Sequence, residues 1–294
     1  MIMNKIAITA PAGKIGYQLA SLLHQQQANV VLIGLERHQE KLEKFIAAGM
    51  EFRIADSDNA AELTIAFEDI DSLFWLSPPN VTEDMKIWYQ NTAIAAAKAI
   101  KSSNIKHIVN LSSIGAGHGQ ELGTVTYIEY PELELNKLDV NIVHLRPGYF
   151  MENLLLQQQS IQNGILELPF SADHDLPWIS VNDIAATACD LLLDPSWRGK
   201  WIKTIMGPEN LTLTQVAAKL STALGYQVNY RQISYQSLAQ TMSEFMPKNA
   251  VDDLIKTFKA LGDENGIYAM PRTRDAYTPI SLEDFAREKL SVND

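Results

Sequence analysis

The stretch KIAITAPAGKIG, from Lys5 to Gly16, decides the fold of this chain. It begins as a short apolar run with a β-branched signature, passes through the small-residue turn Ala10–Gly13, and continues into a helix with an apolar face. A strand, a small-residue turn and a helix in this order open a dinucleotide-binding site, because the N–H groups and the dipole of the helix N-terminus favour a phosphate there. The spacing Ala10-x-x-Gly13-x-x-Gly16 departs from the usual glycine pattern at its first position.

Phosphate binding at this turn needs small side chains, since anything larger than a methyl group would hold a pyrophosphate away from the backbone. We therefore expect a cofactor-binding turn, and the alternative is a tight strand-to-helix turn without a ligand. The proline that follows Ala10 removes one possible N–H donor. The expected cofactor contacts in this segment are Ala10, Gly13, Lys14, Ile15 and Gly16.

The composition describes an ordinary globular protein, with 46% apolar and 20% charged residues among 294. A net charge of -11, with scattered Lys and Arg, argues against direct binding to nucleic acid. The one cysteine, Cys189, excludes an internal disulfide, and the histidines lack metal-ligand spacing, so we expect no metal site. No apolar run approaches the length of a membrane span, so we expect no membrane partner and take the cytoplasm as the default location.

Strand-like and helix-like segments alternate as far as residue 150. Continuous apolar strands separated by helices indicate a parallel sheet covered on both faces, and crossovers of one hand make it doubly wound. We therefore expect an α/β Rossmann fold, with an NAD(P)-binding domain over residues 1–152. The expected strands are Ile6–Thr9, Val30–Gly34, Phe52–Ala55, Ser72–Leu76, His107–Leu111 and Ile142–Leu145, and the expected helices begin near 15, 39, 60 and 82.

Beyond residue 150 this alternation stops. We expect residues 153–294 to form a smaller, mostly helical substrate or lid domain that is interleaved with the first, with one or two strands returning to the main sheet. Two capping boxes, Ser180-x-x-Asp183 and Thr212-x-x-Gln215, would open helices in this part, and Gly225 would end the second of them.

Two residues after the second expected strand, Glu36 and Arg37, bear on whether the cofactor is NAD or NADP. A carboxylate at this place bonds the adenosine ribose hydroxyls of NAD, whereas an arginine pairs with the 2′-phosphate of NADP. We expect NADP(H) rather than NAD(H), and the alternative reading of the two residues is an exposed ion pair.

The loops after the other strands supply the remaining expected cofactor contacts, because ligands bind at the carboxyl ends of the strands in such sheets. Asp56 either bonds the adenine amino group or caps the helix that follows. Ser77 and Pro78 would turn the chain beneath the cofactor. Ser112 and Ser113 follow the fifth strand, where a polar group can face the nicotinamide or a substrate.

Four segments of the chain form a set: TAPAGKIG (9–16), ERHQEKL (36–42), NLSSIGAG (110–117) and LRPGYFMENLL (145–155). Together they resemble the NmrA-like group of atypical short-chain dehydrogenases/reductases, and the similarity continues to residue 288. The resemblance implies an NAD(P)-binding Rossmann domain with a cleft roofed by the C-terminal part. It matches Gly13, Gly16 and Arg37 to cofactor contacts, and Pro147, Tyr149, Phe150 and Asn153 to the segment near the nicotinamide.

The proton-transfer residues of ordinary short-chain dehydrogenases are missing. Those enzymes use a tyrosine with a lysine four residues later, and no Tyr-x-x-x-Lys occurs in this chain. Many NmrA-like reductases keep a lysine four residues before a glutamate. By this resemblance the glutamate is Glu132 and the lysine position holds Ile128, so the usual machinery is absent or rebuilt.

Aromatic side chains near the expected cleft are candidates for stacking on a planar ligand, and the alternative for each of them is interdomain core. Tyr127, His118 and Tyr149 are the candidate catalytic proton donors, although a loop histidine more often has no role. The expected substrate pocket consists of Trp88, Ser113, Tyr149, Phe150, Asn153 and Trp178.

Three functions fit these residues. The first, which we expect, is an NAD(P)H-dependent oxidoreductase acting on a small planar or carbonyl substrate such as a quinone, since hydride transfer needs mainly orientation and a dry pocket. The second is a non-catalytic NADP(H)-binding redox sensor with a protein partner, a type that the family also contains. The third is a non-redox reaction, such as isomerisation or elimination, on a repurposed fold. The chain would be a monomer or a homodimer.

Overall fold

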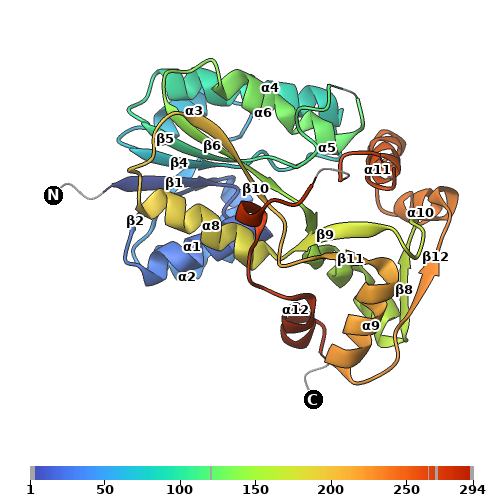
Figure 1. The fold of residues 1–294 in the computed structure, drawn as a ribbon. Coiled ribbons are helices and arrows are strands. Elements are labelled where there is room, and N and C mark those ends of the chain that lie inside the picture. The colour runs from blue at the N-terminus through green and yellow to red at the C-terminus, as the bar shows by residue number, and fades with distance from the viewer. Residues whose placement is uncertain (1–3, 120, 264, 269–270, 292–294) are drawn as a thin grey trace.

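Seven strands form the central sheet of the computed structural model, which describes residues 4–119, 121–263, 265–268 and 271–291. They are β1 (Lys5–Thr9), β2 (Asn29–Gly34), β3 (Glu51–Ile54), β4 (Ser72–Trp75), β5 (His107–Leu111), β6 (Asn141–Pro147) and β10 (Lys200–Ile205). All neighbours in the order β3-β2-β1-β4-β5-β6-β10 are parallel (Figure 1). This is the doubly wound order of a dinucleotide-binding fold with one strand added at the edge, so the expected Rossmann fold is confirmed.

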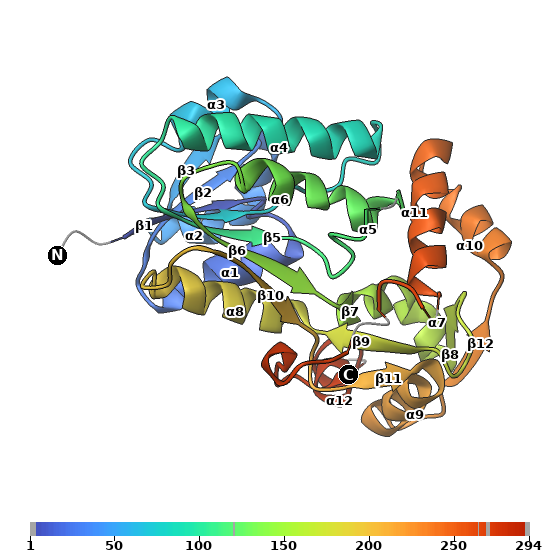
Figure 2. The same ribbon diagram turned by 45° about the horizontal axis from the view of Figure 1, so that its top comes forward.

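Helices cover both faces of this sheet, as Figures 1 and 2 show. One face carries α3 (Ala60–Ala66), α4 (Met85–Lys101) and α6 (Glu129–Leu135), and the other carries α1 (Lys14–Gln25), α2 (Gln39–Ala47) and α8 (Val181–Leu193). Because α8 and β10 come from the second half of the chain, the two halves are interwoven. The expected return of a strand to the main sheet is therefore confirmed.

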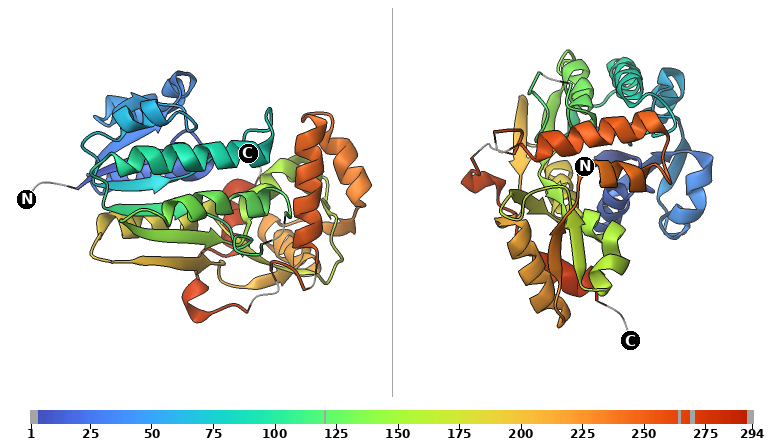
Figure 3. Two further views of the ribbon diagram at one scale, coloured as in Figure 1. Left: turned by 90° about the horizontal axis from the view of Figure 1, so that it is seen from above. Right: turned by 90° about the vertical axis from the view of Figure 1, so that its right-hand side faces the viewer.

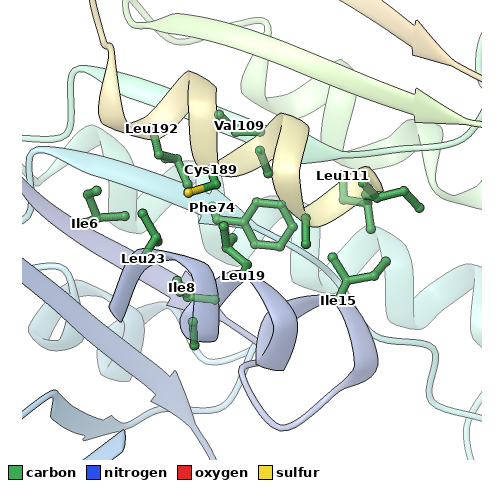
Figure 4. Close-up of a cluster of buried hydrophobic side chains, with 14 of the residues drawn as sticks. Ile6, Ile8, Ile15, Leu19, Leu23, Phe74, Val109, Leu111, Cys189 and Leu192 are labelled. Atoms are coloured by element: carbon green, nitrogen blue, oxygen red, sulfur yellow. The ribbon is translucent and has the colours of Figure 1, made fainter. Parts of the chain in front are cut away.

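The core between the sheet and helices α1 and α8 consists mainly of aliphatic side chains (Figure 4). Ile15, Leu19 and Leu23 recur on the face of α1 that meets the sheet, where Phe74 of β4 is fully buried. Burying each such side chain contributes roughly 1.5–3 kcal/mol. Cys189 lies in the same core, and burial raises the pKa of its thiol to about 11.

The smaller part combines helices with two small sheets (Figure 3). The sequence predicted a mostly helical part with a helix at Leu213–Leu224, but it predicted neither sheet, because their strands are short and lack a clear alternation. The boundary at residue 152 stays a prediction. The elements are β7 (Tyr149–Phe150), α7 (Gln158–Gln162), β8 (Ile165–Leu168), β9 (Asp175–Ile179), β11 (Asn210–Thr212), α9 (Leu213–Leu224), β12 (Asn229–Gln232), α10 (Tyr235–Met242), α11 (Lys248–Leu261) and α12 (Leu282–Lys289), with sheets β11-β9-β7 and β12-β8.

One of the two predicted capping boxes is present. Thr212 and Gln215 bond each other's backbone at the start of α9, and Gly225 ends that helix with a positive φ of 78°. The prediction of a capping box at Ser180 is wrong. Ser180 does cap α8 with its hydroxyl, but the Asp183 carboxylate accepts a hydrogen bond from a backbone N–H just before α12 instead.

Thr9 joins the carboxyl ends of β1 and β4, where the crossovers of the sheet change direction. Its buried Oγ1 accepts a hydrogen bond of 2.8 Å from the N–H of Leu76. The same hydroxyl lies 3.2 Å from the carbonyl oxygens of Phe74 and Leu76, to either of which it can donate. Ligands of open α/β sheets bind at this switch point, so Thr9 fixes the local geometry of the ligand-binding edge.

Replacing Thr9→Val keeps the shape of the side chain but leaves the Leu76 N–H without its acceptor. We expect the free energy of unfolding to fall by about 1–3 kcal/mol, the usual penalty for an unsatisfied buried donor. Denaturant unfolding measures this change. The control Thr222→Val, at a hydroxyl on the exposed face of α9, should change stability by less than about 0.5 kcal/mol; equal effects of the two substitutions would refute a special role of Thr9.

Candidate functional site

The turn between β1 and α1 is held by close backbone contacts. The N–H of Gly13 donates to the carbonyl oxygen of Ala10 at 3.1 Å. A Cβ on Gly16 would overlap the same carbonyl oxygen and lie 2.9 Å from the Cα of Pro11, so only glycine fits there. Ala10 itself has a φ of +49°, the left-handed region in which glycine is favoured.

The N-terminus of α1 is free to bind an anion. Its cap residue, Gly13, offers no side-chain hydrogen bond to the helix, and the first intrahelical bond runs from Tyr17 N–H to Gly13 O at 2.9 Å. The N–H groups of Lys14, Ile15 and Gly16 therefore have no acceptor among the described residues. Such a helix end, at the switch point of the sheet, suits a phosphate group.

The end of β2 lies beside this turn. A Cβ on Gly34 would be 3.6 Å from Pro11 Cδ and 3.3 Å from Nδ1 of His38. The short 3-10 helix Glu36–His38 follows, with the Leu35 N–H donating to His38 Nδ1 at 3.3 Å. Both Glu36 and Arg37 are exposed, and neither forms an ion pair among the described residues, so the alternative of an ion pair between them is wrong.

Asp56 does not cap helix α3. Asn59 does so, by accepting hydrogen bonds from the N–H groups of Ala61 and Glu62. The capping alternative for Asp56 is therefore wrong, and its contact with adenine stays a prediction.

The segment after β4 is anchored from below by helix α4. The indole of Trp88 donates to the carbonyl oxygen of Pro78 at 2.8 Å, and the hydroxyls of Thr92 and Ser77 are 3.2 Å apart. Ser77 and Trp88 are both buried. Trp88 thus supports the turn beneath the expected cofactor position.

The segment after β5 contains a buried hydroxyl without a protein partner. The N–H of Ser112 donates to Leu145 O at 2.7 Å, but its buried Oγ has no partner among the described residues. Ser113 differs, because its Oγ accepts a hydrogen bond from the Gly115 N–H at 3.1 Å. Pro147 lies nearby, with its carbonyl oxygen accepting from the Ile114 N–H at 3.3 Å.

Tyr149 and Trp178 belong to the core of the smaller part. Their rings meet edge to face, with centroids 4.8 Å apart. Trp178 is fully buried and its indole donates to Leu211 O at 3.3 Å, so it backs the site rather than facing a ligand. Burial raises the pKa of Tyr149, against a smaller opposite effect of a hydrogen bond with Asn153. Phe150, next to them, is half-buried.

Tyr127 connects the two halves of the chain. It lies in the short helix α5 (Thr124–Tyr127) and donates its hydroxyl proton to Asp253 of α11 at 3.0 Å. Burial, followed by the bond to Asp253, raises the pKa of Tyr127. This contact gives no support to a role of Tyr127 as proton donor. His118 lies exposed in the loop after β5.

Of two buried carboxylates that tie elements together in this region, Glu152 was missed by sequence reasoning and Glu132 was named only through the family resemblance. Both oxygens of Glu152 accept hydrogen bonds from the Val181 N–H, at 2.9 and 3.0 Å, and burial raises the pKa of Glu152. The ammonium of Lys14 approaches the carbonyl oxygen of Glu152 at 3.5 Å, so this residue ties α1 to α8. Glu132 forms a two-pronged ion pair with Arg146, at 2.9 and 2.6 Å. A glutamate inside an otherwise apolar run, as in YFMENLL, is the signal that could have identified the first of them.

The residues present fit a dinucleotide. Helix α1 offers N–H groups without an acceptor, and a side chain on Gly16 would not fit. The Ser112 hydroxyl, which has no partner among the described residues, follows the carboxyl end of β5, the edge at which ligands of such sheets bind. No group of three or more metal-ligating side chains occurs among the described residues, and none of the described helices is long and apolar enough to span a membrane.

Known proteins share both the sequence pattern and the fold. A family model described as the NmrA-like family matches residues 3–285. The NAD(P)H azoreductase of Xenophilus azovorans is 27% identical over 249 residues, 84% of either chain. Quinone oxidoreductase 2 of Escherichia coli is 26% identical over 271 residues, 91% of either chain.

Solved structures agree with this relationship. An NADPH complex of the E. coli NADPH-dependent quinone oxidoreductase matches with a TM-score of 0.72 and 25% identity, covering 92% of this chain and 97% of that one. NmrA, a negative transcriptional regulator in complex with NAD, matches with a TM-score of 0.75 and 17% identity, covering 99% and 96% of the two chains. At that identity, NmrA shows the shared fold alone.

Replacing Ala10→Gly should relieve the positive φ of this turn. We expect the free energy of unfolding to rise by about 0.5–1 kcal/mol, because the strain that is removed exceeds the entropy that glycine adds to the unfolded chain. The control Gln27→Gly removes another positive φ, of 54°, at the exposed end of α1 and should stabilise by a similar amount. A loss of stability in Ala10→Gly alone, measured by denaturant unfolding, would contradict the assigned conformation.

Proposed function

Because this chain belongs to the NmrA-like family, we propose that it is an NAD(P)H-dependent reductase of small planar substrates, with NADP(H) as its preferred cofactor. The observation that carries the proposal is the uncapped N-terminus of α1 at the switch point of the sheet. The names of the relatives, an azoreductase and a quinone oxidoreductase, support planar electron acceptors as the substrate class.

When bound, the reduced nicotinamide supplies a hydride. The chain then has three tasks: to hold the phosphates, to orient the ring and to exclude water from it. The N–H groups of Lys14, Ile15 and Gly16 serve the first task. Ser77 and Pro78, supported by α4, and Ser112 serve the second.

The proton that completes the reduction comes from water in this proposal. No Tyr-x-x-x-Lys pair is present, and the Tyr127 hydroxyl is bonded to Asp253. A quinone that accepts a hydride becomes a hydroquinone anion, whose oxygen takes up a proton from solvent without an enzymatic acid. Quinones and related planar acceptors therefore fit this site better than simple ketones, whose alkoxide needs a proton donor.

NADP(H) preference is proposed on the position of Arg37. This exposed guanidinium follows β2, next to the phosphate turn, and has no carboxylate partner among the described residues. It is free to pair with a 2′-phosphate, whereas Glu36 repels one only if its carboxylate turns inward.

Replacing Arg37→Ser should weaken binding of NADPH about 10- to 100-fold and leave binding of NADH within twofold, because a charge-assisted contact of about 1.5–3 kcal/mol is lost only with the phosphate. Calorimetric titration with both nucleotides measures the two affinities. Arg231→Ser, at an exposed arginine paired with Glu167 in the smaller part, serves as the control and should change neither. Equal weakening of both nucleotides in Arg37→Ser would refute the proposed preference.

The proposed activity is tested with purified protein, NADPH and a panel of quinones and azo compounds. We expect NADPH to be oxidised only when an acceptor is present, and more slowly when the phosphate turn is altered. In Gly13→Asp the added carboxylate should repel the pyrophosphate, so NADPH binding and turnover should fall together by at least tenfold. An absence of turnover across the panel by protein that binds NADPH would exclude the reductase.

That last outcome would favour a second function, an NADP(H)-binding sensor without turnover. Two observations point toward it: Ile128 at the position where related reductases keep a lysine, and the Tyr127 hydroxyl engaged with Asp253. A sensor should bind oxidised and reduced cofactor with different affinities and should co-purify with a protein partner. Equal affinities without a partner would exclude it.

A further inference from the structure

A row of polar side chains crosses the sheet beneath α4 and α6. Trp75, Asn110 and His144 are register partners on β4, β5 and β6, and all three are buried. Their side chains share a face because parallel partners point to the same side of a sheet. Most of this face is an apolar core, so each polar atom in the row needs a hydrogen-bond partner.

The hydrogen bonds of His144 indicate which atoms of the row donate and which accept. Its Nδ1 lies 3.0 Å from Asn110 Nδ2, and its Nε2 lies 3.2 Å from Oδ1 of Asn136. Burial lowers the pKa of the His144 imidazole, which is therefore neutral at physiological pH. The neutral ring donates from Nε2 to Asn136 and accepts at Nδ1 from the Asn110 amide, so Asn110 turns its carbonyl oxygen the other way.

Three buried atoms of this row and of the residue that continues it after β5 lack a protein partner among the described residues. They are Trp75 Nε1, Asn110 Oδ1 and Ser112 Oγ. Asn110 and Ser112 lie two residues apart, on the same side of the extended chain, and Trp75 lies opposite Asn110 on the next strand. One of these atoms is an obligatory donor, one is an obligatory acceptor, and the hydroxyl can do either.

We propose that one internal water molecule joins these three atoms and makes Ser112 a hydrogen-bond donor toward the ligand. The water oxygen accepts from Trp75 Nε1–H, and its two hydrogens go to Asn110 Oδ1 and Ser112 Oγ. Three partners are typical of a buried water. Because the water donates to the Ser112 oxygen rather than accepting from it, the Ser112 hydroxyl keeps its own hydrogen for a bond to the ligand.

A hydroxyl fixed as a donor selects a carbonyl oxygen. Two carbonyls meet that description: that of a quinone-type substrate and that of the nicotinamide carboxamide. Trp75 and Asn110 are positioning residues in this scheme, acting through the water and Ser112. The water assignment stands on the buried atoms alone, whereas the role of Ser112 in ligand binding rests on the proposed function.

The water is tested first, by nuclear magnetic resonance on the 15N-labelled protein. The indole N–H signal of Trp75, assigned from its loss in Trp75→Phe, should show a cross-peak to a long-lived water molecule. Trp178 is the internal control, because it is equally buried but donates to Leu211 O, and its indole should show none. A Trp75 signal as silent toward water as that of Trp178 would overturn the water assignment.

The effect on Ser112 is tested with Trp75→Phe, which removes the indole N–H and leaves an aromatic ring away from the ligand. If Ser112 binds the substrate carbonyl, we expect kcat/KM for a quinone to fall about three- to tenfold with NADPH affinity unchanged. If Ser112 binds the carboxamide, we expect NADPH affinity to fall about three- to tenfold. Either result matches the loss of one neutral hydrogen bond. Ser112→Ala should show the same effect, and the double variant should add little to either single one.

Trp197→Phe is the matched control, since the Trp197 indole donates to Leu191 O away from this row, and it should change neither quantity. Unchanged affinity and unchanged kcat/KM in Trp75→Phe would overturn the positioning role. If the wild type binds NADPH but reduces no substrate, the proposed function fails, while the indole cross-peak and the NADPH affinity of Trp75→Phe still decide this inference.

Discussion

The close approach of α1 to the turn that precedes it is the constraint on which the rest of the site depends. A side chain on Gly16 would overlap the carbonyl oxygen of Ala10, so the helix begins directly against the end of β1. This contact places a helix N-terminus without a side-chain cap at the point where the sheet changes direction. Thr9 holds the two central strands together at the same point. Backbone N–H groups that point to one place suit an anion, and the ends of β2, β4 and β5, with Arg37, Ser77 and Ser112, follow along the same edge of the sheet.

Sequence reasoning found the Rossmann sheet because its strands are buried on both faces and read as continuous apolar runs. It did not find the two small sheets, whose strands are short, nor the true cap geometry at Ser180, where Asp183 is engaged by a distant segment. The row of Trp75, Asn110 and His144 could not be predicted either, because the spacing of residues along the chain does not determine the register between strands. Of the candidate site, the phosphate turn was predictable from local pattern, whereas the surroundings of Tyr127 and Trp178 depend on contacts more than 30 residues apart in the chain.

In the region where a tyrosine–lysine pair is missing, the structure uses the side chains present for other contacts. The family resemblance predicts Ile128 at the position of a lysine, and the structure shows the nearby Glu132 paired with Arg146. Tyr127 is used to join α5 to α11. The groups that follow β4 and β5 are neutral hydroxyls, Ser77, Ser112 and Ser113, which can orient a ligand but not donate a proton readily. Such an edge suits acceptors that need a hydride and correct placement rather than acid catalysis.

The position of the pyrophosphate in a crystal structure of the NADPH complex tests the central claim most directly. We expect phosphate oxygens about 3 Å from the N–H groups of Lys14, Ile15 and Gly16, the usual length of such hydrogen bonds, with the nicotinamide ring extending toward Ser112. A dinucleotide bound elsewhere, or no bound dinucleotide in crystals grown at saturating NADPH, would contradict it.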